Sequence, residues 1–371
     1  MTTPTLEAMH RSTVHALSPR ANLEERARQA FVLHVKRHLG AVAASGFPQI
    51  CARHGAEELE QVASVLEASS AYAAWTALSK GSQRQMWQVL SDMICRQEDE
   101  LAEIARDLQT RPPLGSLHLD ADLAIPAYLQ QTAFHGQPGG YVLTRHPEDL
   151  YAGLMQEAGG TLYTRGAGTG VKDSKAQAVV RFIRERFPAF APRRILDMGC
   201  GYGAQTCGYA VAFAEAETHG VDVGGAVLRF GHLRAESLGV ALHLHQMDAA
   251  ATRFPDGHFD LLVSNIVLHE VPPDYLPALM RECCRLLAPG GLMLHQDMPA
   301  QRSGQSACRR FVSMWQRDHN DEPYWPSIVQ TRFSDLLSAA GFASAAIFEA
   351  YVAQSDGPMH WYIVGAKGLS Q

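Results

Sequence analysis

From residue 193 onward, short apolar segments alternate with stretches of helical length, and this alternation constrains the fold more than any other feature of the chain. The segments are "RRILDMGCG", "ETHGVDV", "ALHLHQMDA", "FDLLVSNIV" and "GLMLHQDMP". Strands that alternate with helices predict a parallel sheet in an α/β domain. The stretch "FSDLLSAAGFASAAIFEAYV" then predicts one more helix and strand, and "MHWYIVGAKG" a last strand after a short turn. We expect these two late strands to form an antiparallel hairpin at the sheet edge.

The chain before residue 113 has the periodicity of helices. "LEERARQAFVLHVKRHL" and "EELEQVASVLEASSAYAAWTAL" place apolar residues three and four positions apart, and "SQRQMWQVLSDMICRQEDELAEIARDL" continues the pattern. "RPPLG" at 111–115 breaks it. We therefore expect three parts. An N-terminal all-helical domain for capping or dimerisation spans 1–112, a connecting segment that contributes to a pocket spans 113–190, and the α/β domain spans 191–371.

A glycine-rich loop, "ILDMGCGYGAQT", follows the first strand of the α/β domain and precedes a helix. Gly199, Gly201 and Gly203 would let the backbone approach a ligand closely at the helix N-terminus. Read loosely, the loop also fits the dinucleotide fingerprint. On their own, the glycines leave the choice of ligand open.

Three aspartates separate the possible ligands. Asp197 precedes the first glycine by two residues, Asp222 ends the second strand, and Asp248 ends the third. At these positions a carboxylate can accept hydrogen bonds from both ribose hydroxyls (Asp222) or from an adenine amino group (Asp248). An NAD site predicts Asp222 but neither of the other two.

Here the sequence resembles the class I S-adenosylmethionine-dependent methyltransferases. The matching stretches are "LDMGCGYG", "HGVDV", "QMDA", "FDLLVSNIVLHEV" and "RLLAPGGLML", in the order and spacing of that family over about residues 190–300. The resemblance implies a Rossmann-like, seven-stranded sheet with a reversed final hairpin. It also implies that the three glycines wrap the methionine and ribose portion of the cofactor. By the same resemblance, Asp222 holds the ribose, Asp248 and Ala249 hold the adenine, and Asn265 lies beside the sulfonium.

His269, in "NIVLHEVPP", is the candidate general base. "VLHEV" occupies the place of an "LHDW" stretch in small-molecule O-methyltransferases, with Glu270 in place of the aspartate and Val271 in place of the tryptophan. A structural histidine is the competing interpretation. A third is a divalent metal or Fe(II) site, because His269 and Glu270 would face His295 and Asp297 across neighbouring fourth and fifth strands. Tyr163 is a further candidate, since it precedes the helix before the first strand, a region that often folds over the cofactor in this family.

The segment 299–327 is long for a connection between a strand and a helix, and it is rich in aromatic residues. Such insertions often cap a substrate. Trp315, Tyr324 and Trp325 are expected to pack on an apolar or aromatic ligand, and Asn320 and Glu322 to orient it. Packing against the N-terminal helices is the alternative role for these side chains. His135, in the Gly/Pro loop "AFHGQPGGYVL", is expected to contribute as well.

The amino-acid composition limits the kinds of binding partner and the cellular location that are expected. The 371-residue chain has a formal net charge of −6, which argues against a nucleic-acid partner. It has no run of 18 apolar residues and no apolar stretch near its start, so neither a membrane span nor a signal peptide is expected. Seven cysteines without C-x-x-C spacing indicate free thiols and a cytoplasmic protein. Apolar helix faces near the N-terminus make a homodimer plausible.

Three function hypotheses follow. The leading one is methyl transfer by in-line attack from S-adenosylmethionine to a small-molecule acceptor, with a secondary metabolite as the expected substrate. The second is a cyclase or lyase that consumes the same cofactor and releases 5′-methylthioadenosine. The third is a non-catalytic binding module that retains the fold, which the full set of Asp197, Asp222 and Asp248 disfavours.

Overall fold

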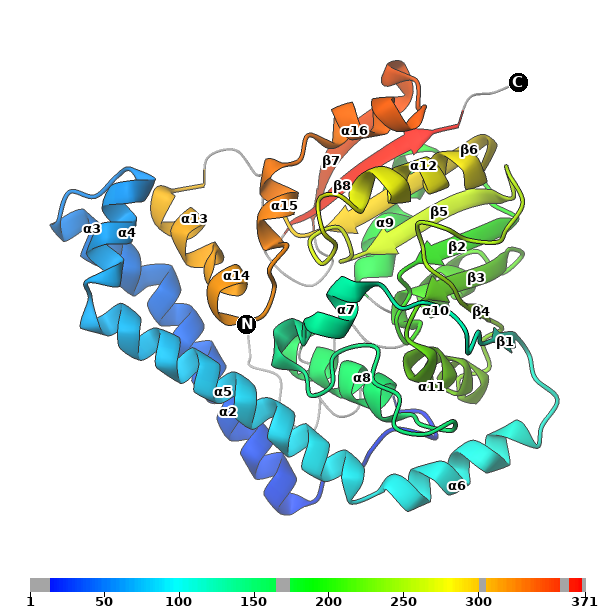
Figure 1. Cartoon of the computed structure of the whole chain (residues 1–371), viewed down its shortest axis with the longest axis horizontal. Coiled ribbons are helices and arrows are strands. Elements are labelled where there is room, and N and C mark those ends of the chain that lie inside the picture. Colours follow the sequence, from blue (N-terminus) through cyan, green and yellow to red (C-terminus); the bar gives the residue numbers. More distant parts are fainter. Residues whose placement is uncertain (1–13, 165–173, 300–304, 354–359, 369–371) are drawn as a thin grey trace.

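The computed structural model describes residues 14–164, 174–299, 305–353 and 360–368 (Figure 1). Six helical elements of the described residues precede the sheet: α2 (Leu23–Ala41), the π-helix η1 (Val42–Gly46), α3 (Phe47–Arg53), α4 (Leu59–Glu67), α5 (Ser70–Cys95) and α6 (Glu98–Gln109). Asn22 begins α2 with a capping box to Glu25. Ser69 accepts from the Ala71 N–H and so starts α5 separately from α4.

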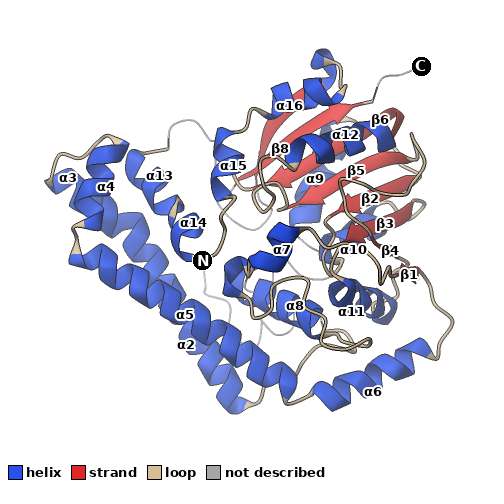
Figure 2. Ribbon diagram, viewed as in Figure 1, coloured by secondary structure: helices blue, strands red, loops and turns tan. Residues whose placement is uncertain are grey.

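One mixed sheet forms the second half of the molecule (Figure 2). Its strands are β1 (Ser116–His118), β2 (Arg194–Met198), β3 (Glu217–Asp222), β4 (His243–Gln246), β5 (Phe259–Asn265), β6 (Leu287–Asp297), β7 (Ile347–Ala353) and β8 (His360–Lys367). The order across the sheet is β1-β4-β3-β2-β5-β6-β8-β7. All neighbours are parallel except β8, which runs antiparallel to both β6 and β7. The expected α/β fold and reversed final hairpin are confirmed.

The sheet has eight strands where seven were expected, because the connecting segment adds β1 beside β4. The close approach depends on Gly115, since a Cβ there would lie 2.0 Å from the Leu242 carbonyl oxygen. The Glu236 carboxylate accepts the backbone N–H groups of Leu114 and Gly115 and holds the entry to the strand. Three residues are too few to show the alternation that reveals a strand in a sequence.

Helices cover both faces of the sheet. One face packs on α12 (Leu276–Leu286) and α16 (Phe333–Ala340) through a core that includes Leu196, Leu262 and Met280. The other packs on α9 (Ser174–Arg186) and α10 (Ala204–Ala212), with Ile195 and Val263 in that core. The alternation of Ile195 and Leu196 between these cores is the two-residue period of a strand buried on both sides.

The helices before the sheet do not stand apart from it. Side chains of α2, α5 and α6 share one buried cluster with α8 (Tyr151–Thr164) and α11 (Gly225–Ser237), which belong to the sheet half. In Figure 1 the crossed pair α2 and α5 lies below and to the left of the sheet, with α8 between them and the strands. The domain boundaries at 112 and 190 stay a prediction.

The remaining helical elements are short. They are α7 (Ala127–Gln131), the 3-10 turn η2 (Phe134–Gly136), α13 (Ala307–Ser313), α14 (Trp315–His319), α15 (Trp325–Gln330) and the 3-10 turn η3 (Ser344–Ala346). The insertion at 299–327, of which 300–304 lie outside the described residues, packs α13 against α3 and α4 around Phe47 and Cys308. None of the helices in the described ranges has the length and apolarity to cross a membrane.

Candidate active site

The glycine loop between β2 and α10 is built on left-handed backbone. Gly199, Gly201 and Gly203 have φ values of +73°, +53° and +73°, a region that other residues enter only with strain. A Cβ at Gly199 would also lie 2.9 Å from the Val267 side chain, and one at Gly201 would lie 2.8 Å from the Gln156 side chain. All three positions therefore favour glycine for conformation, and Gly199 needs it for space as well, whereas the flexible Gln156 side chain can move away from a Cβ at Gly201.

The three aspartates lie at or beside the carboxyl ends of neighbouring strands. Asp222 accepts the N–H groups of Gly201 and Gly224, both at 2.9 Å, which ties the end of β3 to the loop. Burial raises the pKa of Asp222 above its ordinary value. Asp197 is buried and accepts from the Thr206 hydroxyl at 2.7 Å.

Asp248 and Asn265 complete this edge of the sheet. Asp248 accepts from the Ala250 N–H at 2.8 Å and from the Tyr275 hydroxyl, and Ala249 beside it is half-buried. Asn265 Oδ1 accepts from the Tyr209 hydroxyl at 2.9 Å, whereas its Nδ2 is buried with no hydrogen-bond partner. The next residue, Ile266, has φ +62°, which is strained for a β-branched side chain.

His269 lies one loop beyond β5 and pairs with the last residue of β6. Its Nδ1 is 2.6 Å from Asp297 Oδ1, and both side chains are buried. Burial by itself would lower the pKa of His269, but Asp297, with smaller contributions from Glu270 and Glu322, raises it to about 9. The edge of the Trp325 ring packs against the imidazole at 5.1 Å between centroids. Nε2 is the imidazole nitrogen that does not contact Asp297.

Two carboxylates and a second histidine surround that nitrogen. Glu270 Oε1 and Glu322 Oε2 lie 3.9 and 3.8 Å from His269 Nε2, too far for hydrogen bonds. His135 contacts both carboxylates, with Nε2 3.1 Å from Glu270 and Nδ1 2.9 Å from Glu322. Burial works to lower the pKa of His135, yet the two carboxylates raise it to about 10. We call His135, His269, Glu270, Asp297 and Glu322 the charged cluster.

Aromatic rings lie close to the charged cluster. Tyr324 packs edge-on against Tyr128, which packs in the same way against Tyr275. The Tyr141 hydroxyl donates to Glu270 at 3.1 Å, and its ring stacks on Phe134. These rings form a continuous contact from the charged cluster to Tyr275, whose hydroxyl donates to Asp248.

Other predicted site residues have different surroundings. The Asn320 amide donates to Glu322 at 2.9 Å and so supports the charged cluster. Trp315 packs edge-on against Trp75 of α5 rather than in the cluster. Tyr163 belongs to α8, but its side chain lies outside the described residues.

The metal hypothesis for His269 and His295 meets a specific obstacle. His295 is fully buried, with Nδ1 2.7 Å from the Ser264 hydroxyl and Nε2 3.6 Å from Cys283 Sγ, so both nitrogens have contacts away from His269. Burial lowers the pKa of His295 to about 4. These contacts argue against His295 as a ligand, and the metal site stays a prediction.

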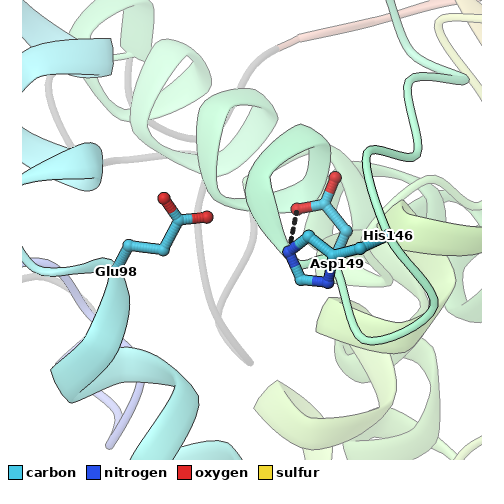
Figure 3. A group of neighbouring side chains, drawn as sticks. All are labelled: Glu98, His146 and Asp149. Atoms are coloured by element: carbon cyan, nitrogen blue, oxygen red, sulfur yellow. Dashed lines mark ion pairs between the residues drawn. The ribbon is translucent and has the colours of Figure 1, made fainter.

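Within the described ranges, one group of three metal-ligating side chains lies close enough to share an ion. It comprises Glu98, His146 and Asp149 (Figure 3). The Arg145 guanidinium already bonds both carboxylates of this group, at Asp149 Oδ1 2.7 Å away and at Glu98 Oε1. A cation here would have to displace an arginine, so we interpret the group as an ion-pair network.

Comparison with known proteins identifies part of the chain. Residues 195–291 match the family model described as "Methyltransferase domain". The chain contains a class I S-adenosylmethionine-dependent methyltransferase domain. The matched residues run from β2 into β6 and include the glycine loop, the aspartates at β3 and β4, and His269. The cofactor of such a domain is S-adenosylmethionine.

Individual relatives match only part of this chain. A trans-aconitate 2-methyltransferase from Methylobacterium radiotolerans is 36% identical over 135 residues, which cover 36% of this chain and 47% of the relative. A demethylmenaquinone methyltransferase from Thermus thermophilus is 33% identical over 31% of this chain and 51% of its own length. A solved structure of Haemonchus contortus phosphoethanolamine N-methyltransferase 2 with S-adenosylmethionine has 15% identity and a TM-score of 0.39, over 52% of each chain. The chain thus spans about half the length, or less, of these relatives.

Outside the methyltransferase domain, sequence reasoning named His135, Asp297 and Glu322 only as secondary candidates and missed Tyr128 and Tyr141. Asn320 and Glu322 lie two positions apart in "HNDEPYW", where an acid and an amide beside aromatics were a usable signal. His135 had a weaker signal, a histidine followed by glycine in an aromatic loop. Tyr128 had none, because a tyrosine in a five-residue helix looks like ordinary packing.

Proposed function

We propose that the protein transfers the methyl group of S-adenosylmethionine to a small-molecule acceptor, with secondary metabolism as the setting, and that His269 is the general base. One observation supports this most. The glycine loop and the aspartate-lined strand ends of the methyltransferase domain lie beside a buried histidine–aspartate pair, and a ring of aromatic side chains links the two. A cofactor site and a basic nitrogen therefore share one edge of the sheet.

The residues at this edge fit the cofactor. Asp222 keeps lone pairs for the ribose hydroxyls, although each oxygen already accepts one N–H. Asp248 and Ala249 would hold the adenine, and the glycine loop preceded by Asp197 would wrap the methionine portion. Asn265 Nδ2 is a buried donor that a ligand can satisfy. When bound, the cofactor supplies an electrophilic methyl group on a sulfonium.

His269 would remove the acceptor's proton through Nε2. The bond from Nδ1 to Asp297 fixes the ring orientation and leaves Nε2 as the basic atom. Glu270 and Glu322 would hold the acceptor's polar hydrogens, since both lie near Nε2 without bonding it. Trp325, Tyr324 and Asn320 would line the substrate side of this space and exclude water. Tyr163 stays a candidate on sequence grounds alone.

The base role predicts a large effect of His269→Ala. Turnover should fall about 10²- to 10⁴-fold with cofactor affinity retained. In the parent enzyme, kcat/KM should rise with pH through about 9, because only the neutral imidazole accepts a proton. Release of labelled methyl groups into acceptor fractions measures both. Unchanged turnover in His269→Ala would refute the base role.

Incubation without any acceptor tests the reaction class. The proposal predicts that S-adenosylmethionine stays intact until an acceptor is added. Accumulation of 5′-methylthioadenosine in that incubation would instead support a cyclase or lyase. Loss of turnover on treatment with a chelator would point to a metal at His269.

A homodimer through the N-terminal helices belongs to the same proposal. Phe31 on α2 and Leu78 on α5 are 58% and 57% exposed, and in the proposed dimer they would pack against the second copy. Sedimentation velocity of the whole chain tests this, since a monomer at micromolar concentration would contradict it.

A further inference from the structure

The charged cluster has an unusual arrangement: two imidazoles share two carboxylates. His135 bonds Glu270 and Glu322 at 3.1 and 2.9 Å, whereas His269 faces the same two carboxylates at 3.9 and 3.8 Å. Glu322 is only 2% exposed, and its Oε2, the oxygen nearer to His269, is buried with no hydrogen-bond partner. The carboxylates are therefore held toward His135 and away from His269.

His135 is fixed by backbone contacts as well as by its ring. It has φ +57°, and Glu322 follows Asp321, which has φ +54°. Such non-glycine residues in the left-handed region persist only when their surroundings hold them there. Two side chains of α5 do so at His135, because the Trp87 and Gln83 side-chain N–H groups both donate to its carbonyl, at 2.7 and 2.8 Å.

The two carboxylates beside the His135 ring favour its positively charged form, although the Asn320 amide nitrogen also lies 3.3 Å from Nδ1. A neutral imidazole has one N–H, so it can donate to only one carboxylate, whereas the imidazolium donates to both. In that form His135 supplies one positive charge between Glu270 and Glu322. It also restrains both carboxylates by charge-assisted bonds, which are stronger than neutral ones.

We propose that His135 is a positioning residue that sets the proton affinity of His269 by holding Glu270 and Glu322 out of hydrogen-bond reach of Nε2. The inference deepens the proposed function, because it rests on His269 as the base. It assigns to a residue outside the matched methyltransferase domain a role in tuning that base. The residue is in turn held by α5, so the helical half of the molecule contributes to the chemistry.

The charged groups around His269 determine whether its pKa rises or falls when His135 is replaced. Asp297 faces it from β6, Glu270 from the adjoining loop, and Glu322 from the turn between α14 and α15. Behind these, the Tyr141 hydroxyl bonds Glu270 and the Asn320 amide bonds Glu322. Lys36 is one step further out, bonded to Gln83. With the charge of His135 removed, the negative potential at Nε2 grows and the two carboxylates can close on it.

The test is an NMR titration of the His269 imidazole in the whole, ¹⁵N-histidine-labelled chain without ligand, with the signal assigned by its loss in His269→Asn. His135→Asn is the main variant, since asparagine tolerates left-handed backbone and keeps a donor. We expect this variant to raise the pKa of His269 by about one unit, which corresponds to a tenfold higher proton affinity. Glu322→Gln should lower the pKa, and the double variant should return it toward the parent value.

Exposed His34, on α2, provides the matched control: His34→Gln should leave the His269 titration unchanged. If His135→Asn does not fold, His135→Gln gives the same test with a different side-chain length. A His269 pKa that stays within about 0.3 units of the parent value in a folded His135 variant would overturn the proposal. The titration needs no methyl acceptor, so its result is separate from whether methyl transfer is found.

Discussion

At the scale of single residues, the glycine loop shows how a turn of left-handed backbone is encoded. Each of its three glycines has a positive φ, and Gly199 also lacks room for a Cβ beside Val267. The need for a positive φ can be separated from the need for space. Gly239, at the end of α11, has nearly the same φ of +72°, but a Cβ there would have nothing within 4 Å.

Gly199→Ala should therefore cost more stability than Gly239→Ala. Both changes force alanine into left-handed backbone, at about 1–2 kcal/mol. Only Gly199→Ala adds a contact, 2.9 Å from Val267 Cγ2, which typically costs another 1–3 kcal/mol or so. Denaturant unfolding measures both, and calorimetry should show weaker S-adenosylmethionine binding in Gly199→Ala alone. Equal losses of stability in the two variants would show that the loop has room to relax.

At the scale of elements, β1, β3 and β4 bring several histidines together on one face of the sheet. His219 Nδ1 lies 3.2 Å from His245 Nε2, and the rings of His118 and His243 pack beside them. Burial, reinforced by the neighbouring histidines, lowers the pKa of both His219 and His245 to about 3. These rings stay neutral in the folded protein at pH values where an unfolded histidine is charged.

This lowering predicts a loss of stability in mild acid. Between pH 6.5 and about 4.5 the unfolded chain binds protons that folded His219 and His245 do not bind. The free energy of unfolding therefore falls as the pH falls, by up to about 1.4 kcal/mol per pH unit for each of these histidines. Close to pH 6.5 the raised pKa values of His135 and His269 oppose this slope, because the folded residues are protonated and the unfolded ones only partly so; below about pH 5.5 they contribute almost none.

His219→Asn should flatten that slope, whatever it does to the stability itself, whereas His34→Asn on the surface should leave it unchanged. Urea unfolding at several pH values gives both slopes. The same slope in the parent and His219→Asn proteins would mean that His219 is charged in the folded state.

The element scale also separates what was predictable from the sequence and what was not. The order of strands after residue 193 followed from alternation, since each buried strand has its own apolar run. The break between α4 and α5 at Ser69 could not be predicted. Apolar residues keep helical spacing across it, and the cap is a local hydrogen bond. Strand β1 was missed because it depends on Gly115 fitting against Leu242, a tertiary contact.

At the scale of the whole molecule, the site depends on segments far apart in the chain. The cofactor-binding candidates lie in one continuous stretch with family-like spacing, so they could be chosen from the sequence. The charged cluster joins the turn at His135, the loop at His269, the end of β6 and the turn at Glu322, and only the fold places these together. Trp315 was also chosen from the sequence as a residue near the substrate, but its ring packs against Trp75 of α5 and not in the charged cluster.

The central claim is that the strand ends around Asp222 bind S-adenosylmethionine, and calorimetric titration of the cofactor tests it most directly. The parent protein should bind with a Kd of about 1 µM to 100 µM, and Asp222→Ala should bind about 100-fold more weakly, a loss of about 2.7 kcal/mol. Asp256→Ala, which removes a carboxylate whose side chain is 82% exposed, is the matched control and should bind normally. Unchanged affinity in a folded Asp222→Ala protein would contradict the account.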